Sequence, residues 1–262
     1  MPELQLWFFG LGATALPAFL CWLVSLRLRD ASIVDRVWSL LFVSAALCYA
    51  WYGNPGASRF WLTMTPLLLW ALRLALHITV RNWGHGEDRR YQQLRRNNQP
   101  NFAIKSLYLV FGLQAALAWI ISLPLLGTML ARRPPGWRDL PGIAVWFAGF
   151  AIEVIADSQL ARFRANPTNR DAIMDRGLWR YSRHPNYFGE CWLWWGLYLL
   201  ALAAGAWWAI VAPLLMTVLL LRVSGVTLLE KDLIERRPGY RSYVARTSAF
   251  VLWPPRRLEP AP

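Results

Sequence analysis

Cysteine is scarce in this sequence, and the cysteines that occur are scattered. Cys21, Cys48 and Cys191 lie far apart, each within an apolar stretch. Their spacing matches neither the paired pattern of a disulfide framework nor the short intervals between the ligands of a zinc site. We therefore expect no disulfide-stabilised fold and no bound metal.

The glycine-rich loops of soluble nucleotide-binding folds are also missing. Gly84 and Gly86 are followed by Arg89, where a third glycine would complete a dinucleotide-binding fingerprint. No Walker A, H-E-x-x-H, C-x-x-C or G-x-S-x-G sequence occurs. A nucleotide bound by this chain would have to be held by arginines and helix ends.

Acidic residues are few, 15 against 28 lysines and arginines, which gives a formal net charge of +13. Such an excess can indicate nucleic-acid binding, but here the cations gather between apolar segments. They are dense in 27–36, 81–105, 162–183 and 222–257 and sparse in the connections between these stretches. By the positive-inside rule the N-terminus lies outside and the C-terminus in the cytoplasm. We expect no nucleic-acid partner.

What the sequence has in abundance is apolar side chains, 56% of the total, with 17 tryptophans. Seven stretches approach the roughly 20 residues with which a helix crosses a bilayer. They are residues 6–26, 33–52, 60–80, 103–125, 141–160, 187–204 and 206–222. Because lipid offers no partner to backbone amides, each should be helical. The sequence predicts an all-α membrane protein with seven transmembrane helices, the first of them retained rather than cleaved.

Ionisable side chains within the expected spans are the candidate functional groups, because charge at membrane depth is costly. Glu153 and Asp157 lie four residues apart on one face of the fifth helix, and Arg164 lies seven residues further on. They could form a buried ion-pair relay. Helix-end charge is the alternative, and it explains Arg164 better than it explains the two carboxylates.

The stretch "GLWRYSRHPNYFGE" (177–190) opens the sixth apolar run. Pro185 and Asn186 suit a helix N-terminus, where free amides favour an anion. The basic side chains that flank it are Arg180, Arg183 and His184. Glu190 lies one turn further in, on the side of Asn186. A cationic membrane flank with a capping Asn would explain the cations, but it would not explain Glu190.

Further polar residues lie in the second and third expected spans and in the segment after the seventh. Arg73, His77 and Arg81 recur at helical spacing in the third expected span, which is typical of a cavity wall, and Asp35 interrupts the start of the second. The seventh span ends at Arg222. An amphipathic tail follows it, which can lie in the membrane interface, contribute to a site, or do both. Its polar residues are Glu230, Lys231, Asp232, Tyr240 and Tyr243.

The run "GLWRYSRHPNYFGE", with "SIVDRVW" upstream and "GEDRRY" between, resembles the bacterial membrane proteins grouped with the steroid 5α-reductase C-terminal domain. The resemblance covers residues 30–255. It implies a multi-pass protein of the bacterial inner membrane that binds NADPH on its cytoplasmic side. It also implies reduction of the Δ4 double bond of 3-oxo-Δ4 steroids.

Together with the clusters above, the resemblance implies a cofactor site. Its residues are Asn82, Asp157, Arg164, Arg180, Arg183, His184, Asn186, Tyr187, Glu190, Arg222, Tyr240 and Tyr243. The chain departs from the family at Glu153, where the family has Asn, and at Val226 and Glu230, where animal enzymes have His and Tyr. The role of Glu153 and the contacts of the tail should therefore differ.

On the substrate side, the resemblance implies a carboxylic acid that polarises the 3-oxo group, and Asp35 is the candidate. His77 and Arg73 are the alternatives for this catalytic role, and Trp38 and Trp70 are expected to line the substrate. A donor aimed at the oxygen that becomes negative during hydride addition stabilises the transition state.

We expect one integral-membrane reductase domain, 1–262, that acts as a monomer. Its substrate cavity should lie mainly in 1–125 and its cofactor site mainly in 73–96 and 150–250. The lipophilic, steroid-like substrate should enter from the bilayer.

Two other function classes stay open. Isoprenylcysteine and phospholipid methyltransferases are also similar to "YSRHPNYFGE" followed by an apolar hairpin and an acidic tail, and they use S-adenosylmethionine. The arginines and the Asp157–Arg164 pair favour a phosphate-bearing cofactor instead. A non-enzymatic membrane lipid-binding or assembly protein is the third reading.

Overall fold

A computed structural model describes residues 3–170, 172–223 and 239–256. This part of the chain is helical and contains no strand, which confirms the expected all-α class. The helices are α1 (Glu3–Leu28), α2 (Val34–Gly53), α3 (Ala57–Arg81), α4 (Arg89–Asn97), α5 (Phe102–Ser106), α6 (Leu113–Ile121), α7 (Leu123–Leu130), α8 (Leu140–Ala165), α9 (Pro185–Ala203), α10 (Val211–Val218) and α12 (Tyr240–Arg246). Short 3-10 turns occur at Ala31–Ile33, Trp137–Asp139, Pro167–Asn169, Gly177–Arg180 and Trp207–Ile210, and π-helical stretches at Leu107–Gly112 and Leu219–Val223.

Within the described residues, five helical segments are long and apolar enough to cross a membrane. They are Glu3–Leu28, Ala31–Gly53, Ala57–Arg81, Phe102–Ile121 and Trp137–Ala165. These are the helices of a membrane-embedded protein, and they match the first five expected spans. The sixth and seventh expected spans correspond to α9 and to the shorter apolar helix Trp207–Arg222, which are not among the five.

The fourth expected span is shorter than predicted. It ends at Ile121, and Pro124 then occupies the first turn of the separate helix α7. Proline has no amide hydrogen to continue the preceding helix but is tolerated in the first turn of a new one. The helix therefore breaks next to a proline, a residue whose effect on a helix can be predicted from the sequence.

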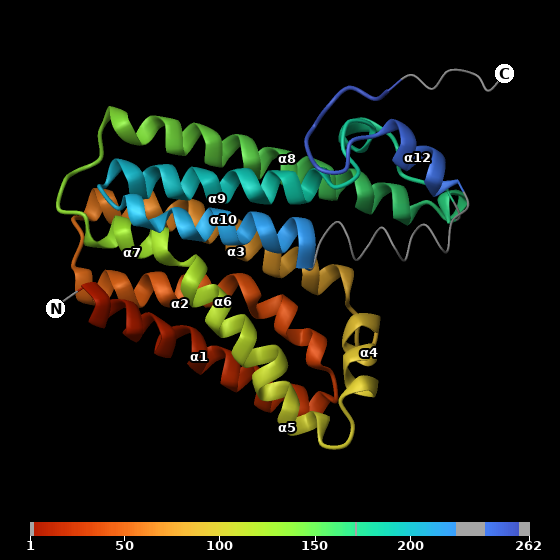
Figure 1. Ribbon diagram of the computed structural model, residues 1–262, viewed down its shortest axis with the longest axis horizontal. Coiled ribbons are helices and arrows are strands. Elements are labelled where there is room, and N and C mark those ends of the chain that lie inside the picture. Colours follow the sequence, from red (N-terminus) through yellow and green to blue (C-terminus); the bar gives the residue numbers. More distant parts are fainter. Residues whose placement is uncertain (1–2, 171, 224–238, 257–262) are drawn as a thin grey trace. The chain divides into compact units, whose positions relative to one another are not determined.

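The chain divides into two compact units, and the first comprises Met1–Arg138 and Leu200–Ala212. Here α2 packs between α1 and α3 (Figure 1). One face of α2 is completely buried through Leu41, Phe42 and Tyr49. The hydroxyl of Tyr49 lies 2.9 Å from that of Ser122, directly after α6. This buried hydrogen bond links α2 to the end of α6.

The second unit comprises Asp139–Leu199 and Pro213–Pro262, and α8 and α9 run side by side in it (Figure 1). Their backbones approach closely at Gly149 and Gly189. A Cβ atom on Gly149 would lie 2.4 Å from the amide nitrogen of Leu193, and one on Gly189 would lie 2.6 Å from that of Glu153. Small residues permit such an approach between membrane helices. The crossing brings the polar residues of the two helices together.

The described C-terminal segment, 239–256, lies against the turn that precedes α9. Backbone hydrogen bonds join the amide of Arg183 to the carbonyl of Ser248 at 2.9 Å and the amide of Trp253 to the carbonyl of Tyr181 at 3.0 Å. The hydroxyl of Ser182 also donates to the carbonyl of Phe250 at 2.8 Å. The segment is therefore held along its length by the "RYSR" stretch.

Candidate functional site

Asp35, in the first turn of α2, is the centre of a polar cluster in the first unit. The phenol of Tyr91 donates to its Oδ1 at 2.6 Å, and Nη2 of Arg90 lies 3.0 Å from its Oδ2. Nε2 of Gln114, in α6, donates to the Tyr91 oxygen at 3.1 Å. Three helices, α2, α4 and α6, thus contribute to one site, and the Asp35 side chain is only 18% exposed.

Helix α4 reaches Asp35 because the loop before it is attached to the start of α2. Oε1 of Glu87 accepts from the amide of Ala31 at 2.8 Å and from Nη2 of Arg95 at 2.7 Å. The amide of Asp88 donates to the hydroxyl of Ser32 at 3.3 Å. These bonds satisfy amides at a helix start, where the helix itself provides no acceptor. They fix the position of Arg90 and Tyr91.

Titratable groups in α4 and in the loop before it have shifted pKa values. Burial raises the pKa of Tyr91, and the Asp35 carboxylate raises it further, so the phenol keeps its proton at neutral pH. Burial opposes ionisation of Glu87, but the bonds from Arg95 and Ala31 outweigh it and lower the pKa of that carboxyl. The cluster therefore holds a proton-bearing phenol beside two ion pairs, Arg90 with Asp35 and Arg95 with Glu87.

An aromatic wall continues from Asp35 along α2. Trp38 and Phe42 contact edge to face with ring centroids 5.1 Å apart, and Phe42 contacts Trp70 of α3 at 5.6 Å. Trp70 is completely buried, whereas Trp38 is half-buried. Such pairs are favoured arrangements of aromatic rings. The two tryptophans expected on the substrate side are thus brought together through a residue that the sequence did not indicate.

The remaining site residues predicted in the first unit lie on α3 or at its end. Arg73 and His77 are half-buried in α3, one turn apart. Asn82 caps the helix, and its amide donates to the carbonyl of Ile78 at 3.0 Å. Its side-chain oxygen accepts from Nε of Arg81 at 3.3 Å. Nη2 of Arg36 reaches its carbonyl at 3.5 Å, which links the start of α2 to the end of α3.

In the second unit, the close crossing of α8 and α9 joins Asp157 to Asn186. Nδ2 of Asn186 donates to Oδ1 of Asp157 at 3.1 Å. Asp157 is 7% exposed and Glu153, one turn before it, is 2% exposed. The sequence placed both carboxylates on one helix face, and that face is buried against α9. A buried carboxylate that accepts from an amide can also accept from hydroxyl groups of a ligand.

Arg183 serves α12. Its Nη1 donates to the carbonyl of Val244 at 3.0 Å and to that of Thr247, and the residue is 8% exposed. The last carbonyls of a helix have no partner within it and favour a cation. The guanidinium that the sequence assigned to a ligand phosphate thus caps a helix C-terminus.

The tyrosines of α12 are buried in the same contact. The hydroxyl of Tyr243 donates to the carbonyl of Trp179 and lies 3.3 Å from that of Ser182. Burial, and after it the neighbouring Tyr240, raises the pKa of Tyr243, so it donates as a neutral phenol. Tyr240 packs on Tyr243 with ring centroids 5.6 Å apart. Both predicted tyrosines thus hold α12 against the "GLWRYS" turn.

The other predicted residues of this unit differ in their exposure. His184 is buried and stacks on Tyr187 with ring centroids 5.6 Å apart. Glu190 is half-buried in α9. The arginines at exposed positions are Arg164, Arg180 and Arg222. The tail residues Val226, Glu230, Lys231 and Asp232 lie outside the described residues.

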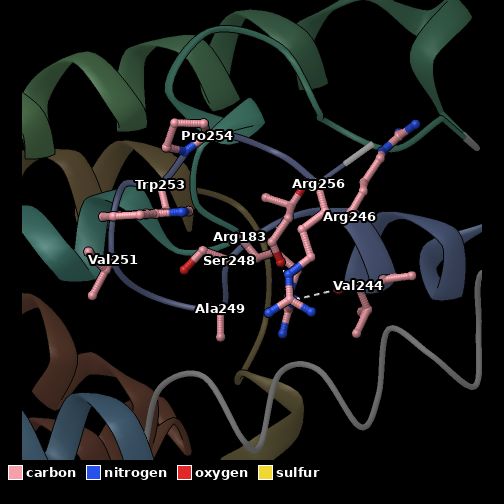
Figure 2. A pocket seen from close by; sticks show the side chains of 11 residues that line it. Arg183, Val244, Arg246, Ser248, Ala249, Val251, Trp253, Pro254 and Arg256 are labelled. Carbon is pink, nitrogen blue, oxygen red and sulfur yellow. Dashed lines mark hydrogen bonds between the residues drawn. The ribbon is translucent and has the colours of Figure 1, made fainter. Parts of the chain in front are cut away.

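Two pockets open beside the C-terminal segment of this unit. The smaller, about 530 Å³, is lined by Arg183, Arg246 and Arg256 together with the backbone around Ser248, and Figure 2 shows it. The larger, about 880 Å³, is lined by Arg176, Arg180, Arg246 and Arg256. Arginine-lined pockets of this size suit small anionic ligands.

Arg90, Tyr91 and Gln114 around Asp35 were not predicted from the sequence, and neither were Arg176, Arg246 and Arg256 around the pockets. The stretch "GEDRRY", which belongs to the family resemblance, contains both Arg90 and Tyr91. A polar residue within an apolar span was the signal for Gln114. The three pocket arginines carried no signal beyond the general basicity of their segments.

Comparisons with known proteins give a family but no function. The model of a family described as "Protein of unknown function (DUF1295)" matches residues 21–247, which is most of the chain. An uncharacterised protein of the fission yeast Schizosaccharomyces pombe is 26% identical over 260 residues, covering 87% of this chain and 74% of its own length. No solved structure matches the chain significantly.

Proposed function

The chain belongs to the DUF1295 family, and we propose that this member is a membrane-embedded, NADPH-dependent reductase of a lipophilic enone such as a 3-oxo-Δ4 steroid. The observation that carries the proposal is the cluster of Asp35, Tyr91 and Gln114 beside the aromatic wall of Trp38 and Phe42. A proton-bearing phenol bonded to Asp35, one helical turn before Trp38 on α2, suits a ligand that is apolar except for one carbonyl.

The contacts of Asp35 refine its assigned role. Both of its oxygens accept, one from Tyr91 and one from Arg90, so the residue is best placed as a carboxylate. A carboxylate cannot donate to a substrate carbonyl. We therefore assign polarisation of the carbonyl to the Tyr91 hydroxyl, and orientation of that hydroxyl to Asp35 and Gln114. Arg73 and His77 remain alternative donors.

The remaining steps of the proposed reaction require few protein groups. NADPH, when bound, supplies the hydride that adds to the β-carbon of the enone. Electron density then moves to the carbonyl oxygen, where a donor such as Tyr91 stabilises the enolate. Protonation of the α-carbon completes the saturated ketone, with water as the proton source. The burial that raises the pKa of Tyr91 also limits water around its hydroxyl, which strengthens the donor.

Residues of the second unit fit the cofactor's polar groups. The buried Asp157 and Asn186 are suited to ribose hydroxyls or the carboxamide, because both offer hydrogen bonds without net attraction for phosphate. Arg164 and Arg222, at exposed helix ends, are suited to phosphate. Arg183, whose guanidinium caps α12, is better suited to supporting the site than to contacting the ligand.

The test is an assay of the full chain, purified in detergent, with NADPH and a small enone panel that includes progesterone and testosterone. Loss of reduced-nicotinamide absorbance that requires both NADPH and the enone is the expected result, with the saturated ketone identified by mass spectrometry. Methyl transfer from S-adenosylmethionine to a lipid, without NADPH oxidation, would establish the alternative class instead. Absence of both activities would leave the lipid-binding or assembly reading.

A further inference from the structure

The two pockets of the second unit are contiguous and together form a basic concavity. They share Arg246, Thr247, Pro254 and Arg256 as a common wall. One side is the turn 175–181, and the other is the C-terminal segment. The amide of Arg256 donates to the carbonyl of Arg246 at 2.8 Å, which closes the C-terminal segment into a loop. We call this concavity the arginine pocket.

Positive charge in the arginine pocket greatly exceeds negative charge. Arg246 is paired with Asp175 at 2.6 Å, and Asp175 is the single carboxylate among the lining residues. Arg183 is directed to the carbonyls of α12. Three arginines remain in the lining, Arg176, Arg180 and Arg256, and all three are exposed.

These three guanidiniums make no hydrogen bond or ion pair with any residue that the structure describes. Their convergence depends on backbone geometry. Gly177 adopts a left-handed conformation (φ +59°), which turns the chain between Arg176 and Arg180. The amide of Leu178 is held by Gln159 at 3.0 Å. A general cytoplasmic excess of cations needs no pocket and no such turn.

Like charges that line one pocket repel one another, and although water screens this repulsion at exposed positions, a bound anion relieves it. Guanidinium groups bind phosphate through paired, charge-assisted hydrogen bonds. We propose that the arginine pocket binds the phosphate groups of a small ligand, with Arg176, Arg180 and Arg256 as the contacts. The phosphates can come from a nucleotide or from a lipid headgroup. For the nucleotide source alone, the inference rests on the proposed reductase function.

The first experiment titrates inorganic pyrophosphate into the full chain in neutral detergent and follows the heat of binding. Pyrophosphate should bind the native protein, and Arg180→Gln and Arg256→Gln should each weaken binding by roughly tenfold, the loss of one charge-assisted contact. Arg241→Gln is the matched control, because Arg241 is exposed on α12 outside the pocket. It removes the same charge from the same unit and should leave the affinity unchanged.

Two results would overturn the proposal in this arm. One is the absence of binding to the native protein. The other is an equal loss in Arg241→Gln, which would assign the affinity to diffuse charge. Unchanged unfolding temperatures for all three variants are expected, because none of the replaced side chains makes a hydrogen bond or ion pair with the described residues.

A second arm identifies the source by displacement of bound pyrophosphate. NADPH and phosphatidylglycerol in mixed micelles are added separately, with phosphatidylcholine micelles as the uncharged control. Displacement by NADPH assigns a nucleotide, and displacement by phosphatidylglycerol assigns a lipid headgroup. Displacement by neither would mean an adventitious ion only and would overturn the proposal. Binding of pyrophosphate does not depend on turnover, so failure of the enone assay alone would remove the reductase function and leave the pocket.

Discussion

The phenol oxygen of Tyr91 lies 2.6 Å from Oδ1 of Asp35, although 56 residues separate them along the chain. The contact positions a hydroxyl that keeps its proton, because burial and the adjacent carboxylate raise the pKa of Tyr91. It links α4, which is outside the expected spans, to the first turn of α2. In the proposed reaction Tyr91 polarises the carbonyl of the substrate, and Asp35 orients the Tyr91 hydroxyl.

Replacement of Tyr91 tests that assignment most directly. Tyr91→Phe keeps the ring and removes the donor, so turnover of the enone should fall by roughly 100-fold, the usual effect of deleting one oxyanion donor. NADPH affinity should not change. Tyr108→Phe is the control, because Tyr108 is 60% exposed in the same unit. Equal turnover of the two variants would transfer the role to Arg73 or His77.

Acidification should loosen the attachment of α4. The pKa of Glu87 is lowered in the folded protein, so its bonds to Ala31 and Arg95 contribute stability above the ordinary carboxyl pKa of 4.5 and lose it as the pH falls further. Amide hydrogen exchange in α4 should therefore accelerate between neutral pH and pH values below 4.5, after correction for the intrinsic rate. Glu87→Gln should show fast exchange at both pH values. A wild-type protection that stays constant over this range would contradict the assignment.

The crossing of α8 and α9 gives a stability prediction. Gly149→Ala places a methyl group 2.4 Å from a backbone nitrogen of α9, which cannot yield as a side chain could. Overpacking of this kind costs about 1–3 kcal/mol, so the unfolding temperature should fall. Gly12→Ala, in α1, has open space around the added methyl group and should be neutral or slightly stabilising. Equal unfolding temperatures for the two variants would mean that the helices can separate without loss.

Local patterns in the sequence predicted the helices and one site face well. Glu153 and Asp157 follow each other at helical spacing, and their shared face is buried as expected. The spacing of residues along a helix and the free-energy cost of a charge in a membrane depend on residues close together in the chain. Both can therefore be predicted without a structure. The break at Pro124 carried a local signal too, but the apolar run around it concealed its importance.

Contacts between distant segments could not be predicted in this way. Gln114 reaches Tyr91, and Tyr91 reaches Asp35, only because α4 and α6 pack beside α2. Arg183 illustrates the same limit. Its position before a helix suggested a phosphate contact, whereas the carbonyls that it binds belong to α12, about sixty residues later. An arginine side chain needs hydrogen-bond acceptors, but the sequence does not show which acceptors lie near Arg183 in the fold.

The bond between Asp157 and Asn186 should couple the two residues energetically. Asp157→Ala and Asn186→Ala should each weaken NADPH binding, and the double variant should lose less than the sum of the two. Residues in direct contact typically show coupling energies of about 0.5–3 kcal/mol, so the coupling should lie in this range. Fluorescence of bound NADPH measures each affinity. Strict additivity would show that the two side chains act separately on the ligand.

Arg183 and Arg180 offer a matched pair of arginines three residues apart in one turn. Arg183 is 8% exposed and caps α12, whereas Arg180 is exposed and makes no hydrogen bond or ion pair with the described residues. Arg183→Gln leaves the carbonyls of Val244 and Thr247 without their cation, so it should cost about 3 kcal/mol of unfolding free energy. The C-terminal segment should then be cleaved faster by a protease added in limiting amount.

Arg180→Gln should instead leave unfolding and proteolysis unchanged and affect only phosphate binding. The two variants remove the same charge, so a difference between them reflects burial and hydrogen bonding rather than net charge. If Arg183→Gln were as stable as Arg180→Gln, the capping contact would contribute nothing. If Arg183→Gln lost phosphate affinity while its C-terminal segment stayed protected, the guanidinium would be a direct ligand contact, as the sequence suggested.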